Sequence, residues 1–261
     1  MPTVRVQADT LDDENRRFAQ MPLRQPVFLN SVPKSGSHLL RNILRMFVPV
    51  EQQYGRDFIQ WANLQQHRSA FDPAHPMLSW GHLFLADASA IETASTRRIL
   101  LYRDPYDWVI ARARFFISEQ FAGNMDHLKS GALTADELLT MMIFGLPAKA
   151  PSLRDIYEMN AAAWLGARVH VVTYEDMVRH VGALDTPDAD AFFGALLDAC
   201  GIERPGDWRE RIRVGSDRKQ SGTARENLTG IGIELPDTLG PRHRALVDYQ
   251  APGLRALLGY D

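Results

Sequence analysis

Short apolar runs alternate with helical patterns along this chain. The run Val27–Ser31 is brief and largely apolar, which is typical of a strand buried on both faces. Apolar residues then recur at helical spacing from Leu39 to Phe47, until Pro49 ends the pattern. This part of the chain therefore predicts a strand, a tight polar loop and a helix.

Two later apolar runs have the same character. Residues 98–102 predict a second strand, which ends at Arg103, and Asp104 can cap a helix that begins at the proline behind it. Residues 168–174 predict a third strand, preceded by an alanine-rich helix over residues 152–165. Strands that alternate with helices predict an α/β fold, with a central parallel sheet covered by helices on both faces.

The length of the chain and two irregular stretches suggest how it is organised. A chain of 261 residues fits one large domain, which we expect over residues 26–261. Residues 1–20 are polar and acidic, and residues 1–25 predict a partly flexible lead-in. The segment 215–237 contains four glycines and little periodicity, so it is a candidate lid over cofactor and substrate.

Composition narrows the classes of function. The net charge of −3 lacks the basic excess of nucleic-acid-binding proteins. Neither a signal peptide nor an apolar stretch of membrane-spanning length is evident, and Cys200 is the single cysteine. We expect a cytoplasmic protein without a metal, a nucleic-acid partner or stable membrane insertion. The oligomeric state stays open.

The loop Pro33–His38 is the strongest candidate for chemistry. Loop amides and a helix N-terminus point N–H groups at an anion, and Lys34 adds a positive charge beside them. Nucleotide triphosphatases have the order Gly-x-x-x-x-Gly-Lys, whereas here the lysine precedes Gly36. The loop therefore predicts a phosphate-bearing nucleotide, without triphosphate hydrolysis through a Walker lysine.

Four segments, in order, resemble motifs of the sulfotransferase family that uses 3′-phosphoadenosine 5′-phosphosulfate (PAPS). They are Pro33–His38, Leu100–Asp107, Tyr174–Met177 and, less closely, Arg218–Gly222. Members of this family have a P-loop-like nucleotide-binding α/β fold. They transfer a sulfuryl group to a hydroxyl or amine and release adenosine 3′,5′-bisphosphate. The resemblance implies this reaction on a small-molecule acceptor, without a metal.

The resemblance also implies roles for individual residues. Lys34 would contact the 5′-phosphosulfate, and the loop residues behind it would donate N–H and hydroxyl groups; these are Ser35, Gly36, Ser37 and His38. The 3′-phosphate would lie against Arg103 and, from the late loop, against Arg218, Lys219 and Gln220. Tyr174 would bind the adenine.

Two positions depart from the family pattern. Ala111 stands where a serine usually shares the 3′-phosphate, and Arg112 or Arg114 could replace that serine or face solvent. Gln220 stands where glycine is usual, so the backbone of the late loop could differ from that of the family.

His82 is the candidate general base. The segment Ser79–Leu83 resembles the family's Gly/Thr-His-Leu element before the second strand. Transfer to a neutral acceptor requires removal of its proton, and histidine has a suitable pKa near neutrality. A structural role is the simpler alternative for any of the eight histidines, and His38 is the second candidate.

Two other functions remain open at this stage. A nucleoside or small-molecule kinase could carry an altered phosphate loop, although the residue order counts against it. A non-catalytic relative could keep the nucleotide cleft and lose the chemistry, which the departures at Ala111 and Gln220 would allow. The sequence does not identify the acceptor.

Overall fold

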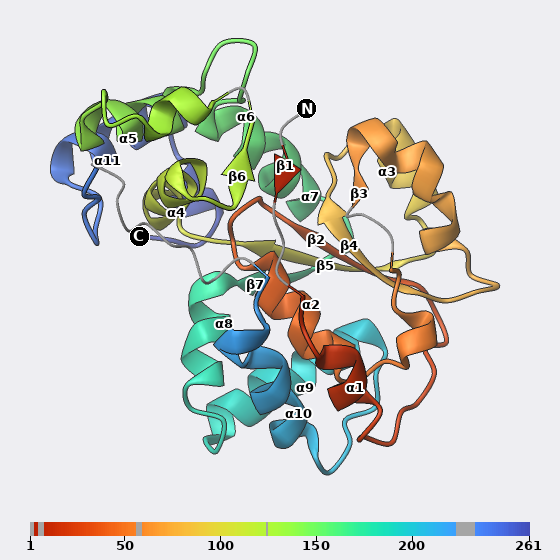
Figure 1. The fold of residues 1–261 in the computed structure, drawn as a ribbon. Helices are drawn as coiled ribbons and strands as arrows, with labels where there is room; N and C mark the ends of the chain where they lie inside the picture. The colour runs from red at the N-terminus through yellow and green to blue at the C-terminus, as the bar shows by residue number, and fades with distance from the viewer. Residues whose placement is uncertain (1–2, 5–7, 56–58, 124, 223–232) are drawn as a thin grey trace. The chain divides into compact units, whose positions relative to one another are not determined.

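The chain divides into two compact units in the computed structural model, which describes residues 3–4, 8–55, 59–123, 125–222 and 233–261 (Figure 1). The sheet unit comprises Ala8–Tyr102 and Met159–Ser221. The helical unit comprises Met1–Gln7, Arg103–Glu158 and Gly222–Asp261. The expectation of one domain over residues 26–261 stays a prediction.

The sheet unit is built on five parallel strands, which confirms the predicted α/β class. Their order is β3 (Ile59–Gln60), β4 (Leu78–His82), β2 (Val27–Ser31), β5 (Arg97–Tyr102) and β7 (His170–Thr173). The central strand β2 begins at Val27, which lies opposite Leu78 of β4 and Arg97 of β5. After β2 the chain forms the edge strand β3, returns to β4 beside β2, and then crosses to β5 and β7 on the other side of β2. The carboxyl end of β2 therefore lies where the chain changes sides, the place where ligands bind in such folds.

Helices cover the sheet (Figure 1). The α-helices of this unit are α1 (Leu11–Asn15), α2 (Ser37–Arg45), α3 (Asp87–Glu92), α7 (Ala163–Leu165), α8 (Tyr174–Val181), α9 (Pro187–Cys200) and α10 (Trp208–Ser216). The 3₁₀ turns are η1 (Val50–Gln52), η2 (Trp61–Phe71) and η5 (Arg218–Gln220), and the π-helical η4 (Glu158–Ala162) precedes α7. No helix in the described ranges is long and apolar enough to cross a membrane.

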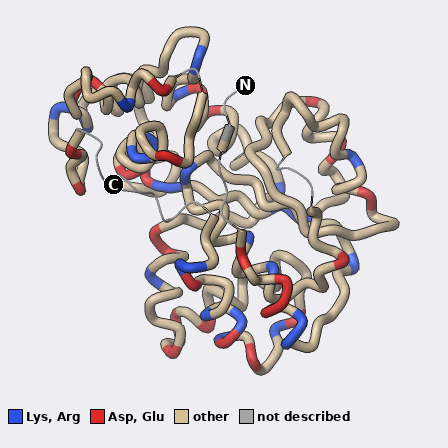
Figure 2. Tube along the Cα trace, in the orientation of Figure 1, with Lys and Arg blue, Asp and Glu red and all other residues tan. Residues whose placement is uncertain are grey.

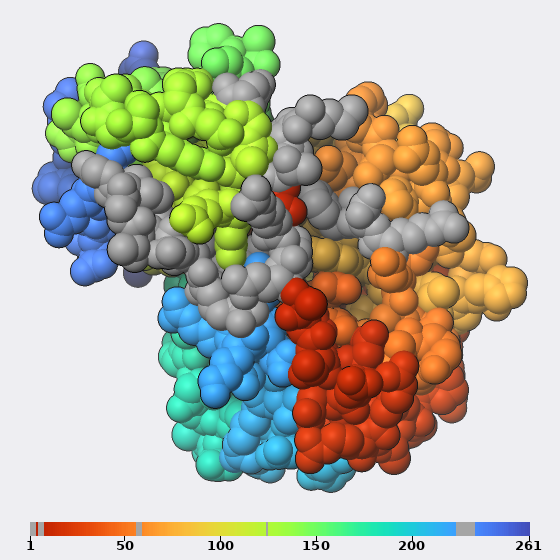
Figure 3. All heavy atoms as spheres, in the orientation of Figure 1, coloured from red at the N-terminus to blue at the C-terminus, as the bar shows by residue number. Residues whose placement is uncertain are grey.

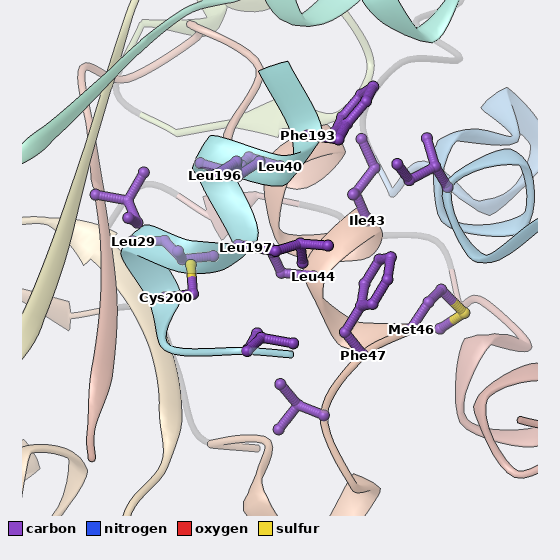
Figure 4. Packing of buried hydrophobic residues seen from close by; sticks show 14 of the residues in the cluster. Leu29, Leu40, Ile43, Leu44, Met46, Phe47, Phe193, Leu196, Leu197 and Cys200 are labelled. Carbon is purple, nitrogen blue, oxygen red and sulfur yellow. The ribbon is translucent and has the colours of Figure 1, made fainter. Parts of the chain in front are cut away.

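Both faces of β2 are buried, as its apolar pattern predicted. Leu29 belongs to the core between the sheet, α2 and α9, where Leu40 and Leu196 meet (Figure 4). On the opposite face, Phe28 contacts Phe71 of η2 edge to face, with ring centroids 5.4 Å apart. Alternate side chains of a strand point to opposite faces, so a fully buried strand needs cover on both.

Cys200, the last residue of α9, packs in this core (Figure 4). Its side chain is 1% exposed, and burial raises the pKa of its thiol to about 12. The thiol is therefore protonated at neutral pH and acts as a small apolar group.

Strand β4 was not among the predicted strands. Its sequence, Leu-Ser-Trp-Gly-His, carries polar residues and a glycine that weaken the strand signal. The glycine is required by packing, because a Cβ at Gly81 would lie 2.0 Å from the carbonyl oxygen of Ile59 on β3. The consequence is that His82 ends a strand next to β2.

The helical unit pairs the short strands β1 (Thr3–Val4) and β6 (Phe121–Ala122) in antiparallel fashion. Its helices are α4 (Pro105–Ile117), η3 (Asp126–Lys129), α5 (Ala135–Phe144), α6 (Leu153–Tyr157), α11 (Pro241–Gln250) and α12 (Leu254–Leu257). The predicted start of α4 is confirmed: the Asp104 carboxylate accepts a hydrogen bond from the Tyr106 N–H at 2.9 Å. The same carboxylate pairs with Arg255 at 2.9 Å.

Much of the predicted lead-in is packed. Leu11 of α1 is fully buried, and Arg45 of α2 forms ion pairs with Asp9 at 2.8 Å and Asp12 at 2.6 Å. Figure 2 marks the acidic positions of α1 in red. The composition of this stretch did not predict the packing, because the ion pairs join residues 33 and 36 positions apart in the sequence.

Removing the side chain of Asn15 tests this packing. Its amide donates to the carbonyl of Arg45 (2.5 Å), the last residue of α2, and to that of Val48 (3.0 Å), three residues later. The last carbonyls of a helix lack partners within the helix. Asn15→Ala should lower the free energy of unfolding by about 1–2 kcal/mol, since the Gln53 amide still bonds both carbonyls. Urea denaturation measures the change. The exposed Arg16→Ala serves as control, and equal stability of both variants would contradict the packing described.

Candidate active site

Three strands bring the candidate residues of the sheet unit to one edge. The loop from Lys34 follows β2, His82 is the last residue of β4, and Tyr174 begins the helix after β7. Carboxyl ends of parallel strands meet at the same edge of a sheet, and ligands bind there in open α/β folds. Their scattered sequence positions thus converge on one region.

The predicted phosphate loop, Pro33–His38, has an unusual backbone conformation. Lys34 has φ of +65° and Gly36 has φ of +93°, so two residues of the loop are left-handed. For lysine this conformation is uncommon and costs free energy, and such residues cluster at functional sites. Gly36 precedes the first turn of α2, which has neither a capping side chain nor an acidic residue. The helix N-terminus is thus suited to an anion.

Ser35 lies at the centre of this loop. Its side chain is fully buried, and its hydroxyl has no hydrogen-bond partner among the residues that the structure describes. Its N–H bonds the carbonyl of Val32 at 3.2 Å. A buried hydroxyl without a partner is costly, so this loop fits a ligand that supplies an acceptor.

Tyr174 lies against Gly36. A Cβ at Gly36 would be 2.5 Å from Cδ2 of the Tyr174 ring, a distance that real side chains do not reach. Glycine is therefore needed here for its positive φ and for the contact with this ring. The predicted contact of Tyr174 with adenine stays a prediction.

Ser31 connects the loop with β4. Its hydroxyl lies 2.7 Å from the Ser37 hydroxyl and 3.1 Å from Nδ1 of His82, and it also reaches the Gly81 carbonyl at 3.2 Å. Ser31 was not among the predicted site residues. A polar residue that ends a buried apolar strand, directly before a phosphate loop, is the signal that could have found it.

The hydrogen bonds of His82 determine its tautomer. Nδ1 lies 2.8 Å from the carbonyl oxygen of Ser31, which can only accept, so Nδ1 carries the proton. The neutral ring then has its lone pair on Nε2. Burial, together with Lys34, lowers the pKa of His82 to about 4, although hydrogen bonds to Ser31 and Gly81 oppose the shift. His82 is therefore neutral at pH 7, in the form that a general base requires.

The backbone behind His82 is also held in place. The side-chain amide of Asn30 donates to the Leu83 carbonyl at 3.1 Å and accepts from the Leu83 N–H at 2.8 Å. Trp164 donates to the same carbonyl at 2.8 Å. Asn30 is buried inside β2, where an apolar residue would be usual, and it orients the end of β4 instead.

His38 is less suited to be the base. Its ring contacts Trp80 edge to face at 5.0 Å, and the guanidinium of Arg41 lies 4.8 Å from the centre of the Trp80 ring. Burial, followed by the charges of Arg41 and Lys34, lowers the pKa of His38 to about 3. The ring is neutral, and the cations around it add to the positive character of this end of α2.

The late residues Arg218 and Lys219 form the turn η5 together with Gln220. The carboxylate of Asp217 accepts from the Lys219 N–H at 2.9 Å and so starts the turn. The Gln220 side chain bonds Thr10. Of the predicted lid 215–237, residues 223–232 lie outside the described residues.

Arg103, Arg112 and Arg114 belong to the helical unit. The Arg103 carbonyl accepts from the Tyr157 hydroxyl at 2.8 Å. Arg112 is 4% exposed and donates to the carbonyls of Met142 (2.9 Å) and Pro151 (2.7 Å), and burial lowers its pKa to about 10. Arg114 pairs with Asp237 at 3.2 Å. The guanidinium of Arg112 thus supports the end of α5 and is not available to replace the serine absent at Ala111.

The fold is similar to that of a solved structure. Mouse sulfotransferase SULT7A1, solved as a complex with PAP, aligns over 95% of this chain and 92% of its own, with a TM-score of 0.53 and 13% identity. The sulfotransferase domain from the curacin biosynthetic pathway aligns over 93% of this chain and 99% of its own, also at 13% identity. Its TM-score of 0.41 is too low to indicate a common fold. No protein-family model and no curated protein matches the sequence. At this identity the likeness concerns the fold alone: the chain has the α/β fold of the mouse sulfotransferase.

Proposed function

We propose that this protein transfers a sulfuryl group from PAPS to a hydroxyl or amine of a small-molecule acceptor. The observation that carries the proposal is the pairing of an anion-binding loop with a neutral histidine. The left-handed Lys34 loop opens an uncapped helix, and Ser31 bonds both Ser37 of that helix and His82. Four sequence motifs and the shared fold point to the same family.

The 5′ end of PAPS binds at the start of α2. The N–H groups of the first turn and the Lys34 ammonium face the phosphosulfate, and the hydroxyl of Ser35 donates to one of its oxygens. The same groups stabilise the negative charge that develops on the bridging oxygen as its bond to sulfur breaks. Positioning and electrostatics supply most of the catalysis, as in phosphoryl transfer.

His82 takes the proton of the acceptor. The acceptor oxygen or nitrogen attacks sulfur in line with the leaving phosphate oxygen, which keeps the electrons of the broken bond. The proton passes to Nε2 of His82, while the Ser31 carbonyl holds the Nδ1 proton and fixes the ring. The products are the sulfated acceptor and adenosine 3′,5′-bisphosphate.

The other end of the nucleotide carries the 3′-phosphate. We assign it to Arg218 and Lys219, which lie on a turn whose start is held by Asp217. Arg103 stays the candidate that the resemblance supplies for the same phosphate. Tyr174, against Gly36, is the candidate for the adenine.

Binding of nucleotides tests the proposal and its rivals. Calorimetry should detect adenosine 3′,5′-bisphosphate in the presence of a chelator. Lys34→Met, which keeps the length of the side chain and removes its charge, should weaken this binding roughly tenfold or more. Lys149→Met, on an exposed loop, is the matched control and should bind as the wild type does.

The same titrations separate the alternatives. A kinase would bind ATP with magnesium in preference to the bisphosphate. A non-catalytic relative would bind the bisphosphate but form no product from labelled PAPS with any acceptor in a broad library. Failure of the wild-type protein to bind the bisphosphate would refute the proposed function.

Replacement of His82 tests its role as base. His82→Ala should keep its affinity for adenosine 3′,5′-bisphosphate, because the ring is assigned to the acceptor proton. Its rate of sulfuryl transfer should fall by a factor of about 10²–10⁴, the usual contribution of a general base. Transfer at nearly the wild-type rate by a folded variant would remove His82 from this role.

The pH dependence of the reaction provides an independent check. A base works in its neutral form, and burial lowers the pKa of His82 to about 4, so activity should be lost only as the pH falls toward that value. The kcat/KM for PAPS transfer should therefore be nearly constant from pH 5.5 to 7.5. An ordinary histidine, with a pKa of about 6.5, would lose roughly tenfold over this range. An acid limb near pH 6.5 would contradict the burial described for His82.

A further inference from the structure

The turn η5 (Arg218–Gln220) has regular 3₁₀ backbone geometry at Gln220, the position where the family pattern expects a glycine. Among the described residues, the non-glycine positions with positive φ are Lys34 and Ala148, so Gln220 needs no left-handed conformation. The Gln220 N–H bonds the Asp217 carbonyl at 2.9 Å and completes a regular 3₁₀ turn. A side chain is therefore tolerated at this position, and its contacts show what it does.

All the polar groups of Gln220 that point out of the turn are bonded. Its side-chain oxygen accepts from the Thr10 N–H at 2.9 Å, and its side-chain NH₂ donates to the Thr10 hydroxyl at 2.8 Å. Its backbone carbonyl accepts from the Asn42 amide of α2 at 3.1 Å. These three bonds, which we call the Gln220 clamp, attach the turn to two separate segments.

The first attachment leads to the phosphate loop. Asn42 is 3% exposed and lies five residues after Ser37, about 7.5 Å along the same helix. Helix α10, which precedes the turn, also packs tightly here: a Cβ at Gly215 would lie 2.6 Å from the Asn42 carbonyl. The turn that carries Arg218 and Lys219 is thus fixed to the helix that opens the phosphate site.

The second attachment leads to the N-terminal segment. Thr10 lies between Asp9, which pairs with Arg45, and the fully buried Leu11. Figure 3 shows this segment, in red, on the surface beside the light-blue residues that precede the turn. Thr10 precedes α1, but its hydroxyl makes no capping bond to that helix. Among the described residues, the hydrogen bond recorded for this hydroxyl is the one from the Gln220 side chain.

We infer that Gln220 is a positioning residue, which holds Arg218 and Lys219 in place for the 3′-phosphate through Thr10 and Asn42. This inference rests on the proposed function. It departs from the role that the resemblance implied, since the Gln220 amide bonds Thr10 in place of the nucleotide. A glycine at position 220 could not make these side-chain bonds to Thr10.

Preorganisation is the physical reason for such a clamp. Arginine and lysine side chains lose much freedom when they bind a phosphate, and a mobile turn would add the cost of ordering its backbone. A turn that is already fixed before the nucleotide arrives avoids that second cost. The free energy of the clamp bonds should therefore appear in the affinity for the 3′-phosphate.

Two variants and a control test the inference. Gln220→Ala removes the side-chain amide, and Thr10→Val replaces the hydroxyl with a methyl group. The control, Thr10→Ser, keeps the hydroxyl. Calorimetry with adenosine 3′,5′-bisphosphate and with adenosine 5′-monophosphate isolates the 3′-phosphate. Thr10→Val should bind the bisphosphate about five-fold more weakly, the worth of roughly one hydrogen bond, and Gln220→Ala at least as weakly as Thr10→Val. Both variants should bind the monophosphate as the wild type does. Thr10→Ser should match the wild type.

The coupling between the variants gives the decisive outcome. The double variant should bind no more weakly than Gln220→Ala, because Gln220→Ala already removes the hydrogen bond that Thr10→Val breaks. Equal weakening for both nucleotides, or full additivity, would overturn the inference in favour of a merely structural role. Unchanged bisphosphate binding in both single variants would also overturn it and leave the proposed function standing. Absence of bisphosphate binding in the wild type would instead refute the proposed function, and the inference with it.

Discussion

The structure depends on one constraint: polar groups at the buried carboxyl end of β2 must be bonded without water. Asn30 and Ser31 stand in a strand that is covered on both faces, so their side chains must find partners in neighbouring segments. Asn30 bonds the backbone of Leu83, and Ser31 bonds Ser37 and His82. The same bonds that satisfy the strand end therefore also bring the predicted phosphate loop and His82 together.

Local patterns were sufficient to predict several elements. The strand β2 and the helix after it follow from apolar spacing, and the start of α4 follows from an aspartate with a proline behind it. Gly36 was expected to allow a positive φ, which the loop has, and the anion site at this loop stays a prediction. These features are determined by residues a few positions apart, so the sequence displays them directly.

Features that depend on residues far apart in the chain could not be predicted from the sequence. The tautomer of His82 is determined by a carbonyl 51 residues away, and Gln220 meets Thr10 across 210 residues. Arg112 illustrates the same limit, because an arginine on a helix looks alike in sequence whether it binds a phosphate or two buried carbonyls. The packing of α1 also depends on Arg45, a residue of another helix.

Cys200 has a practical consequence for spectroscopy. The native thiol is buried within the core and is almost wholly protonated at neutral pH, so it reacts slowly with reagents that require a thiolate. A cysteine introduced at an exposed position would therefore be modified selectively, without removal of the native one. Fluorescent or spin labels could in this way report the motions of single segments in an otherwise unaltered chain.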